Sequence, residues 1–338
     1  MKKTALITGG VGLIGSFIAK QLIRDKIVEK VILLDHYGRY VDSVRPEFFD
    51  YRKLRTLGIE DHIIFERGEA KYFSVVFDVL SRHQPTYIFH LAALPLAKLQ
   101  NLNTQEAMEG TVVSTSNILD AIGILTKERG YKPQRFVYAS SSMVYGDFQY
   151  MPVDESHPTV PKEIYGTMKL SGETVTRGLS NFYGVSSTIV RPSAVYGPTD
   201  MNRRVSQIFV EKALAGEPIT IHGADEALDF TYVKDIANGF VLAAIHSEGS
   251  GETFNITHGN AHTLLEFVEI LRKHFPAIAY EIADRDSFRP KRGTLSIKKA
   301  EKLIGYRPDY DLEKGIAEYI DFVREHNPFL VELSNKDS

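Results

Sequence analysis

The chain has 338 residues, of which 43% are hydrophobic and 25% are charged, values that are ordinary for a soluble globular protein. Forty basic residues stand against 43 acidic ones, and the net charge of −3 argues against binding to nucleic acid or to a membrane surface. The sequence has no cysteine, which excludes disulfides, zinc–thiolate sites and thiol nucleophiles and fits a cytoplasmic location.

Short apolar runs alternate with segments of helical spacing over residues 1–192. Strands are predicted at 5–8, 31–35, 63–66, 87–91, 136–140 and 187–191. Helices are predicted between them at 16–24, 74–81, 111–125 and 163–182. Alternation of this kind, with almost continuously apolar strands, is typical of an α/β fold built on a doubly wound parallel sheet. The basic, apolar N-terminus is interrupted by glycines, so we do not interpret it as a signal peptide.

After residue 192 the elements become shorter and more mixed. Helices are predicted at 205–214, 233–246 and 264–274, and strands at 219–221 and 254–256. The pattern predicts a smaller mixed α/β lobe over 193–330, some segments of which can return to the first sheet. No apolar run approaches the ~18 residues that a membrane-spanning helix needs, so no membrane segment is expected.

The first strand is followed by "T-G-G-V-G-L-I-G-S", in which Gly9, Gly12 and Gly15 are three residues apart. Such glycines allow a tight turn, close approach of backbone amides to a pyrophosphate, and packing of the next helix against the strand. The helix N-terminus attracts phosphate as well. The alternative is a glycine-rich turn that binds nothing.

Asp35 ends the second predicted strand, about twenty residues after the glycines. A carboxylate there accepts hydrogen bonds from an adenosine ribose and repels a 2′-phosphate, which favours NAD over NADP. Arg39, four residues later, is the nearby residue that favours NADP, because an arginine can bind the 2′-phosphate. The glycines, the strand, the helix and Asp35 together predict a Rossmann-type NAD-binding domain over 1–192.

Tyr165 and Lys169 are four residues apart in a predicted helix and therefore lie on one face of it. A tyrosine that acts as a base near pH 7–8 must lose roughly 2–3 units from its usual pKa of about 10. A nearby ammonium group supplies part of that change. The alternative for an isolated Tyr-x-x-x-Lys pair is a surface tyrosine and a solvated lysine.

Several motifs occur in a fixed order: the glycine-rich turn, Asp35, "H-L-A-A" from His90, "A-S-S-S-M-V-Y-G" from Ala139, "Y-G-T-M-K" from Tyr165, and "V-R-P-S-A-V-Y-G-P". As a set they resemble the extended short-chain dehydrogenase/reductases, and among these the NAD-dependent nucleotide-sugar epimerase/dehydratase family. The resemblance extends over nearly the whole chain.

The resemblance implies a role for each matching residue. Tyr165 is expected to be the general base, and Lys169 to hold the nicotinamide ribose and lower the tyrosine pKa. Ser141 is expected to hydrogen-bond the reacting sugar oxygen; its alternative role is to cap the end of a strand. His90 is interpreted as structural. The resemblance implies that NAD is bound by Gly9, Gly12, Leu13, Ile14, Gly15, Asp35, Glu69, Ala70, Leu91, Ala92, Ala93, Tyr165 and Lys169.

For the other substrate, the resemblance implies a nucleotide-diphosphate sugar. Eight Lys or Arg and two acidic residues occur from Arg285 to Arg307, and a diphosphate suits arginine. The lysines at 298, 299 and 302 are interpreted as a solvated helix face. The substrate-binding residues expected are Ser142, Met143, Ser193, Arg204, Arg289 and Arg292. The chain departs from the family pattern at Glu69, Thr111, Ser193 and Leu228.

Ser142 and Met143 occupy the positions where relatives that eliminate water carry an Asp–Glu pair. Neither side chain donates or accepts a proton usefully near neutral pH. We therefore expect hydride and proton transfer at C4 of the sugar without elimination, as in a UDP-sugar 4-epimerase. A C4 dehydrogenase or 4-keto reductase is the alternative, and a non-catalytic NAD-binding regulator a further one. In resembling enzymes the helices near 111–125 and 163–182 pair across a two-fold axis, so a homodimer is expected. No metal site is predicted.

Overall fold

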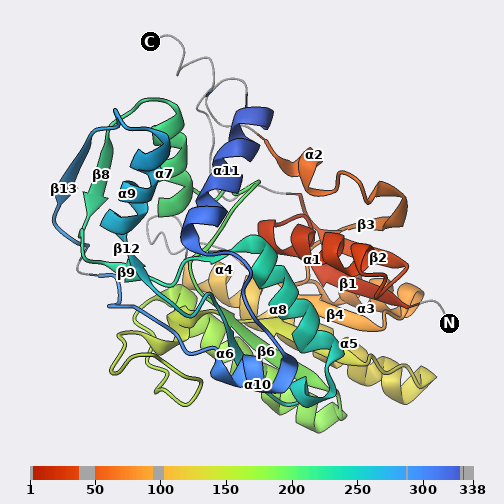
Figure 1. The fold of residues 1–338 in the computed structure, drawn as a ribbon. Coiled ribbons are helices and arrows are strands. Elements are labelled where there is room, and N and C mark those ends of the chain that lie inside the picture. Colours follow the sequence, from red (N-terminus) through yellow and green to blue (C-terminus); the bar gives the residue numbers. More distant parts are fainter. Residues whose placement is uncertain (1–2, 38–49, 94–102, 287, 328–329, 331–338) are drawn as a thin grey trace.

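The computed structural model describes residues 3–37, 50–93, 103–286, 288–327 and 330 of the chain (Figure 1). Its centre is a parallel sheet of seven strands in the order β11-β6-β5-β4-β1-β2-β3. The strands span Thr4–Thr8 (β1), Lys30–Asp35 (β2), Ile63–Arg67 (β3), Tyr87–His90 (β4), Arg135–Ala139 (β5), Ser187–Pro192 (β6) and Thr253–Ile256 (β11). The order reverses between β1 and β4, which in such sheets opens a crevice at the carboxyl edge.

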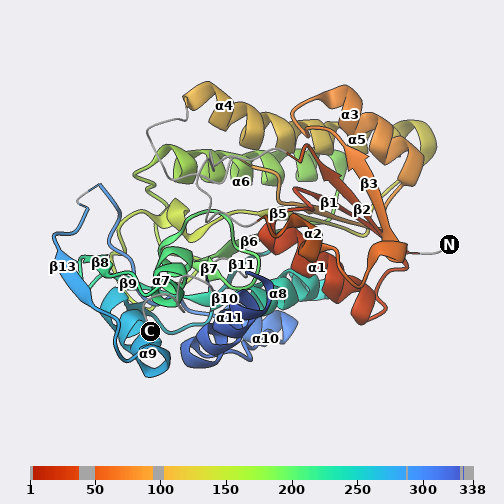
Figure 2. The same cartoon turned by 90° about the horizontal axis from the view of Figure 1, so that it is seen from above.

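Helices cover both faces of this sheet, as the alternation of strand and helix predicts (Figure 2). One face carries α1 (Leu13–Arg24) and α8 (Val233–Ile245), which pack against each other. The other carries α3 (Phe73–His83), α5 (Ser114–Arg129) and α6 (Ile164–Tyr183). Apolar side chains at alternate strand positions pack into two separate cores. Ile7 and Leu33 lie in the core on the α1 side of the sheet, and Leu6 and Ile32 in the core on the α3 side.

The predicted strands of the first 192 residues occur within a residue or two of their expected positions. The helix predicted at 111–125 is longer, because α4 (Thr104–Met108) and a π-helical turn (Glu109–Val113) lead directly into α5. A short helix α2 (Arg52–Arg55) lies between β2 and β3. The segment 253–256, far along the chain, completes the sheet as its edge strand beside β6.

Most of the remaining C-terminal elements form a smaller lobe with its own core, in which Tyr196, Phe230 and Phe267 pack edge to face or tilted. The helices of this lobe are α7 (Val205–Leu214), α9 (Leu264–His274) and α11 (Leu312–His326). A further helix, α10 (Lys298–Ile304), packs against β11 and joins the core of the main sheet. The sequence analysis did not predict α10, α11 or the strand at 280–283. The short strands are β7 (Val195–Tyr196), β8 (Ile219–His222), β9 (Ala227–Leu228), β10 (Thr231–Tyr232), β12 (His262–Thr263) and β13 (Tyr280–Ala283). No helix in the described part of the chain is long and apolar enough to cross a membrane.

Candidate active site

A cavity of about 830 Å³ lies along the carboxyl edge of the main sheet and reaches the C-terminal lobe. The chain leaves β1, β4 and β5 at this edge, so residues distant in sequence meet there. Of the site residues expected from the sequence, Ser193 is buried and is absent from the cavity wall. The others line it: Gly9, Gly12, Leu13, Ile14, Gly15, Asp35, Glu69, Ala70, Leu91, Ala92, Ala93, Ser141, Ser142, Met143, Tyr165, Lys169, Arg204, Arg289 and Arg292.

The glycine-rich turn is shaped to leave its backbone accessible. Gly9 has φ of +67°, and a Cβ there would lie 3.0 Å from the backbone nitrogen of Ala92. A Cβ on Gly15 would lie 2.7 Å from the carbonyl oxygen of Gly9, so only glycine lets α1 start so close to β1. Among the described residues, no side chain caps the start of α1 at Gly12, and the first residues of this helix line the cavity. These amides suit a pyrophosphate.

Asp35 lies at the end of β2 and faces the same part of the cavity. One carboxylate oxygen accepts a hydrogen bond from the Val11 amide at 3.1 Å, and the other accepts from the Tyr37 amide at 2.9 Å. These bonds fix the carboxylate beside the glycine-rich turn, while each oxygen keeps a lone pair for a ribose hydroxyl. The turn and the carboxylate therefore fit the pyrophosphate and the adenosine ribose of a dinucleotide. Arg39 lies outside the described residues.

Arg55, at the end of α2, supports the glycine-rich turn, and the sequence analysis did not find it. Its side chain is 5% exposed and donates to the carbonyl oxygen of Val11 at 2.7 Å and to that of Thr199 at 2.5 Å. Burial lowers the pKa of Arg55 to about 10. The guanidinium joins the turn after β1 to the C-terminal lobe, a contact that sequence spacing does not reveal.

Ser141, Tyr165 and Lys169 lie on the wall of the same cavity as Asp35. Ser141 follows β5 and its hydroxyl accepts from the Met143 amide at 3.2 Å. The Lys169 ammonium donates to the carbonyl oxygen of Ala139 at 2.6 Å and lies 5.8 Å from the centre of the Tyr165 ring. Because α6 carries tyrosine and lysine one turn apart, both face the end of β5.

Burial shifts the titration of both groups on α6. It lowers the pKa of Lys169 to about 7, against the charge of Glu173, which raises it. It raises the pKa of Tyr165, while Arg204 and a hydrogen bond with Ser141 lower it. The sequence analysis expects Lys169 to lower the tyrosine pKa; Arg204, at the start of α7, is a cation acting in the same direction that residue spacing did not reveal.

A carboxyl group also lines the cavity beside Met143, although the turn 139–146 contains none. It belongs to Glu163, immediately before α6, and burial raises its pKa while Arg292 and Arg289 lower it. One Nη of Arg292 contacts the Met143 sulfur at 3.7 Å. The Oε2 of Glu163 and the Nε of Arg292 are buried without a hydrogen-bond partner among the described residues. The turn itself thus offers no acid at Ser142 or Met143, but Glu163 enters the cavity from the start of α6.

The basic stretch from Arg285 to Arg307 is partly neutralised by ion pairs. Arg289 pairs with Asp286 at 3.3 Å, and it faces the cavity together with Arg292. The other pairs are Arg285 with Glu226, Lys299 with Glu252 and Arg307 with Glu301. In the described part of this stretch, the two arginines on the cavity wall are therefore the candidates for binding a diphosphate.

The positions where the chain departs from the family pattern have different environments. Glu69 forms an ion pair with Lys71 at 3.3 Å beside the cavity, and Leu228 is a buried part of the wall. Thr111 is buried in the π-helical turn. His90 is fully buried, hydrogen-bonds Thr8 and Thr115, and has its pKa lowered to about 3 by burial, so it remains neutral.

Comparison with known proteins agrees with this geometry. The family model described as "NAD dependent epimerase/dehydratase family" matches residues 5–257. The chain is 30% identical to a putative UDP-glucose 4-epimerase of Methanocaldococcus jannaschii, over 95% of this chain and 99% of that protein. It is 28% identical to UDP-glucuronate 4-epimerase 1 of Arabidopsis thaliana, over 94% of this chain and 76% of that protein.

The fold is likewise shared with solved structures. One is the UDP-glucuronic acid 4-epimerase of Bacillus cereus in complex with UDP-glucuronic acid and NAD, with a TM-score of 0.84 and 24% identity over 95% of this chain and 99% of that one. The chain thus belongs to the NAD dependent epimerase/dehydratase family, and it is an enzyme whose cofactor is NAD. Within the described residues, no group of three or more His, Asp or Glu is arranged to hold a metal ion.

Proposed function

We propose that the protein is a nucleotide-sugar 4-epimerase, acting on a UDP-sugar or a close analogue. The observation that carries the proposal is the convergence of Ser141, Tyr165 and Lys169 on one wall of the cavity that holds the glycine-rich turn. Relatives over nearly the full length of the chain are named as 4-epimerases of UDP-glucose and UDP-glucuronate, which supports the reaction type and leaves the sugar open.

The chain's own side chains move the proton. The Ser141 hydroxyl orients the C4 hydroxyl of the sugar toward the Tyr165 oxygen, which takes the proton as general base and later returns it. NAD, when bound, supplies the reversible acceptance of a hydride. Arg204 stabilises the tyrosinate, and Lys169 is anchored by the Ala139 carbonyl to hold the nicotinamide ribose.

The substrate diphosphate is assigned to Arg289 on the cavity wall, with Arg292 as a second donor. A guanidinium group offers a diphosphate two parallel hydrogen bonds, so the anchor holds while the sugar presents its other face. Net dehydrogenation or reduction at C4 uses the same residues and differs in the release of the keto sugar.

A second candidate is elimination across C5 and C6, as in a dehydratase. It is favoured by Glu163, whose carboxyl group lies on the cavity wall beside Met143 and has its pKa raised by burial. Loss of a positioned acid or base typically costs about 10²–10⁴-fold in rate. Glu163→Gln therefore strongly reduces activity if the enzyme eliminates water, and affects it little if the enzyme only epimerises.

The experiment incubates the enzyme with NAD and UDP-, GDP- or dTDP-sugars in deuterated water and identifies products by NMR and mass spectrometry. We expect a C4 epimer of unchanged mass with no solvent deuterium on carbon. A 4-keto-6-deoxy product or a pentose would refute the epimerase, and a stoichiometric change in reduced nicotinamide absorbance would indicate a dehydrogenase. Binding of NAD without turnover of any sugar would favour the third alternative, a non-catalytic NAD-binding regulator.

A further inference from the structure

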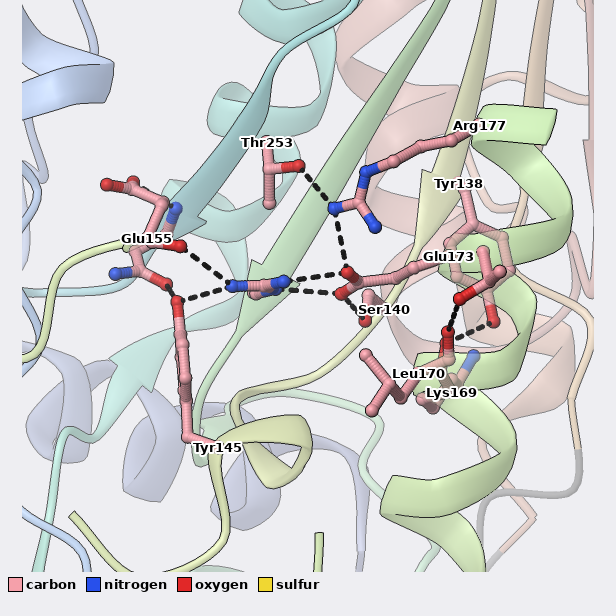
Figure 3. A network of polar contacts seen from close by, with 12 residues as sticks. Tyr138, Ser140, Tyr145, Glu155, Lys169, Leu170, Glu173, Arg177 and Thr253 are labelled. Atoms are coloured by element: carbon pink, nitrogen blue, oxygen red, sulfur yellow. Dashed lines mark hydrogen bonds and ion pairs between the residues drawn. The ribbon is translucent and has the colours of Figure 1, made fainter. Parts of the chain in front are cut away.

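Glu173 lies one helical turn beyond Lys169 on α6 and its side chain is completely buried (Figure 3). It does not line the cavity, so it lies outside the proposed binding site. A buried carboxylate is costly unless its oxygens are hydrogen-bonded and its charge is paired. The partners of Glu173 are therefore informative about its purpose.

Both oxygens of Glu173 are fully engaged. Oε1 accepts from the Ser140 hydroxyl at 2.6 Å and from Nε of Arg191 at 2.7 Å. Oε2 accepts from Nη2 of Arg191 at 2.7 Å and from Arg177 at 3.0 Å. Burial acts to raise the pKa of Glu173, but these hydrogen bonds and the arginine charges bring it below its usual value, so the carboxylate is ionised. Geometry of this kind, two parallel bonds from one arginine, is the strong form of a carboxylate–guanidinium pair.

The contact with Ser140 joins Glu173 to the start of the turn that carries Ser141. Ser140 stands between Ala139, whose carbonyl oxygen accepts from the Lys169 ammonium, and Ser141 itself. A shift of Ser140 would therefore displace the anchor of the lysine and the hydroxyl of the neighbouring serine together.

Arg191 joins the same carboxylate to the other end of the turn. Nη1 of Arg191 donates to the Tyr145 hydroxyl at 3.0 Å, and its guanidinium carbon lies 4.8 Å from the centre of that ring. The Tyr145 hydroxyl in turn donates to Asn255 on β11 at 2.7 Å. Figure 3 shows Ser140 directly beside the Glu173 carboxylate, with Tyr145 farther away at the other end of the dashed contacts. The 3₁₀ turn Ser142–Tyr145 is thus held at both ends by one ion pair.

Glu173 is also the carboxylate that acts on the Lys169 charge. The groups around the ammonium are the rings of Tyr138 at 5.3 Å and Tyr165 at 5.8 Å, and the neutral His90 on β4. Burial lowers the pKa of Lys169 to about 7 and Glu173 opposes that change. Without this carboxylate the lysine would lose its charge at a lower pH.

We propose that Glu173 is a positioning residue for the epimerase reaction: with Arg191 it fixes both ends of the turn that presents Ser141, and it places a negative charge one helical turn from Lys169. The inference rests on the proposed function, but its effect on Lys169 does not require a sugar. It assigns a function to a buried ion pair that the reaction scheme itself does not use.

The central test is Glu173→Gln, which keeps the size of the side chain and removes its charge. The NAD dissociation constant is measured by calorimetry from pH 5.5 to 9, with no sugar present, and the melting temperature is measured in parallel. We expect the pH above which NAD binding weakens to fall relative to the wild type, because the lysine loses the carboxylate that favours its charged form. A folded variant with an unshifted profile would overturn the role of the charge.

Ser140→Ala and Tyr145→Phe test the positioning of the turn. Each removes one hydroxyl group and no charge, so we expect kcat to fall roughly 10-fold with KM and the pH profile unchanged. Arg177→Gln is the matched control, because Arg177 is itself about half exposed and contacts the same carboxylate without touching the turn; wild-type kcat and an unshifted profile are expected. If Glu173→Gln does not fold, wild-type kcat in both hydroxyl variants still refutes the proposal.

The proposed 4-epimerase activity and the role of Glu173 can fail independently in these experiments. If the wild-type enzyme epimerises no nucleotide sugar, the proposed function fails, and the pH dependence of NAD binding still decides whether Glu173 favours the charged form of the lysine. If epimerisation is observed while none of the three variants changes kcat or the profile, the proposed function stands and the positioning role is wrong.

Discussion

Replacement of Asp35 by asparagine is the sharpest test of the cofactor site. The wild-type carboxylate accepts from the Val11 amide at 3.1 Å and from the Tyr37 amide at 2.9 Å. The amide side chain of the Asp35→Asn variant would keep one acceptor oxygen, put a donor group in place of the other and carry no charge. The substitution is nearly isosteric, so it changes what the site attracts without opening a hole.

The magnitude follows from the charge. A 2′-phosphate at about 4–6 Å from the carboxylate is repelled by about 3–4 kcal/mol per unit charge at an effective dielectric of 20. Because Asp35 is only half-buried, screening reduces this to about 1.5–3 kcal/mol, a roughly 10–150-fold preference for NAD over NADP. The nearby Arg52 does little to offset this repulsion, since its guanidinium forms an ion pair with Asp50 at 2.6 Å.

The assay is calorimetric titration of nucleotide-free protein with NAD and NADP at low salt. We expect Asp35→Asn to weaken the binding of NAD several-fold and to strengthen the binding of NADP. The ratio of the two dissociation constants should then be close to one. Asp25→Asn, an exposed carboxylate paired with Arg24, is the matched control and should keep the wild-type ratio. Equal affinities of the wild-type protein for the two cofactors, or an unchanged ratio in Asp35→Asn, would refute the reasoning.

Three other predictions follow from single contacts or surfaces. Tyr165→Phe should abolish exchange at C4, measured by product NMR, while NAD binds with near wild-type affinity; retained turnover would exclude tyrosine as the base. Met108 and Phe182 are 44% and 76% exposed on α4 and α6, so we expect a homodimer by light scattering, and a monomer mass at micromolar concentration would contradict it. Hydrogen bonds from Arg82 and His83 hold the pKa of Glu66 at about 2. The folded-state pKa lies below the usual 4.5, so its stabilisation is present above pH 4.5 and disappears as the pH falls toward 2. Discounted for the exposure of Arg82, Glu66→Gln should cost about 1 kcal/mol at pH 7 and nothing at pH 2, by urea unfolding.

Features that depend on local spacing could be predicted from the sequence. Apolar runs define the strands of the main sheet, and three glycines followed by Asp35 define the dinucleotide end, because both depend on residues close together in the chain. The one-turn spacing of Tyr165 and Lys169 is of the same kind. Ser193, which the resemblance places at the substrate, is buried between Pro192 and Ala194, which both line the cavity.

Features that depend on convergence were decided by the tertiary structure. Arg55 contacts a turn 44 residues earlier in the chain, and β11 joins the sheet from residue 253 onward. The sequence around Met143 indicates a turn without a carboxyl group, yet the packing of α6 brings Glu163 into the same cavity. The pKa of Tyr165 depends on Arg204 for the same reason. Electrostatic effects fall with distance in space rather than with separation along the chain, so residue spacing predicts which groups exist, and only the fold decides which of them interact.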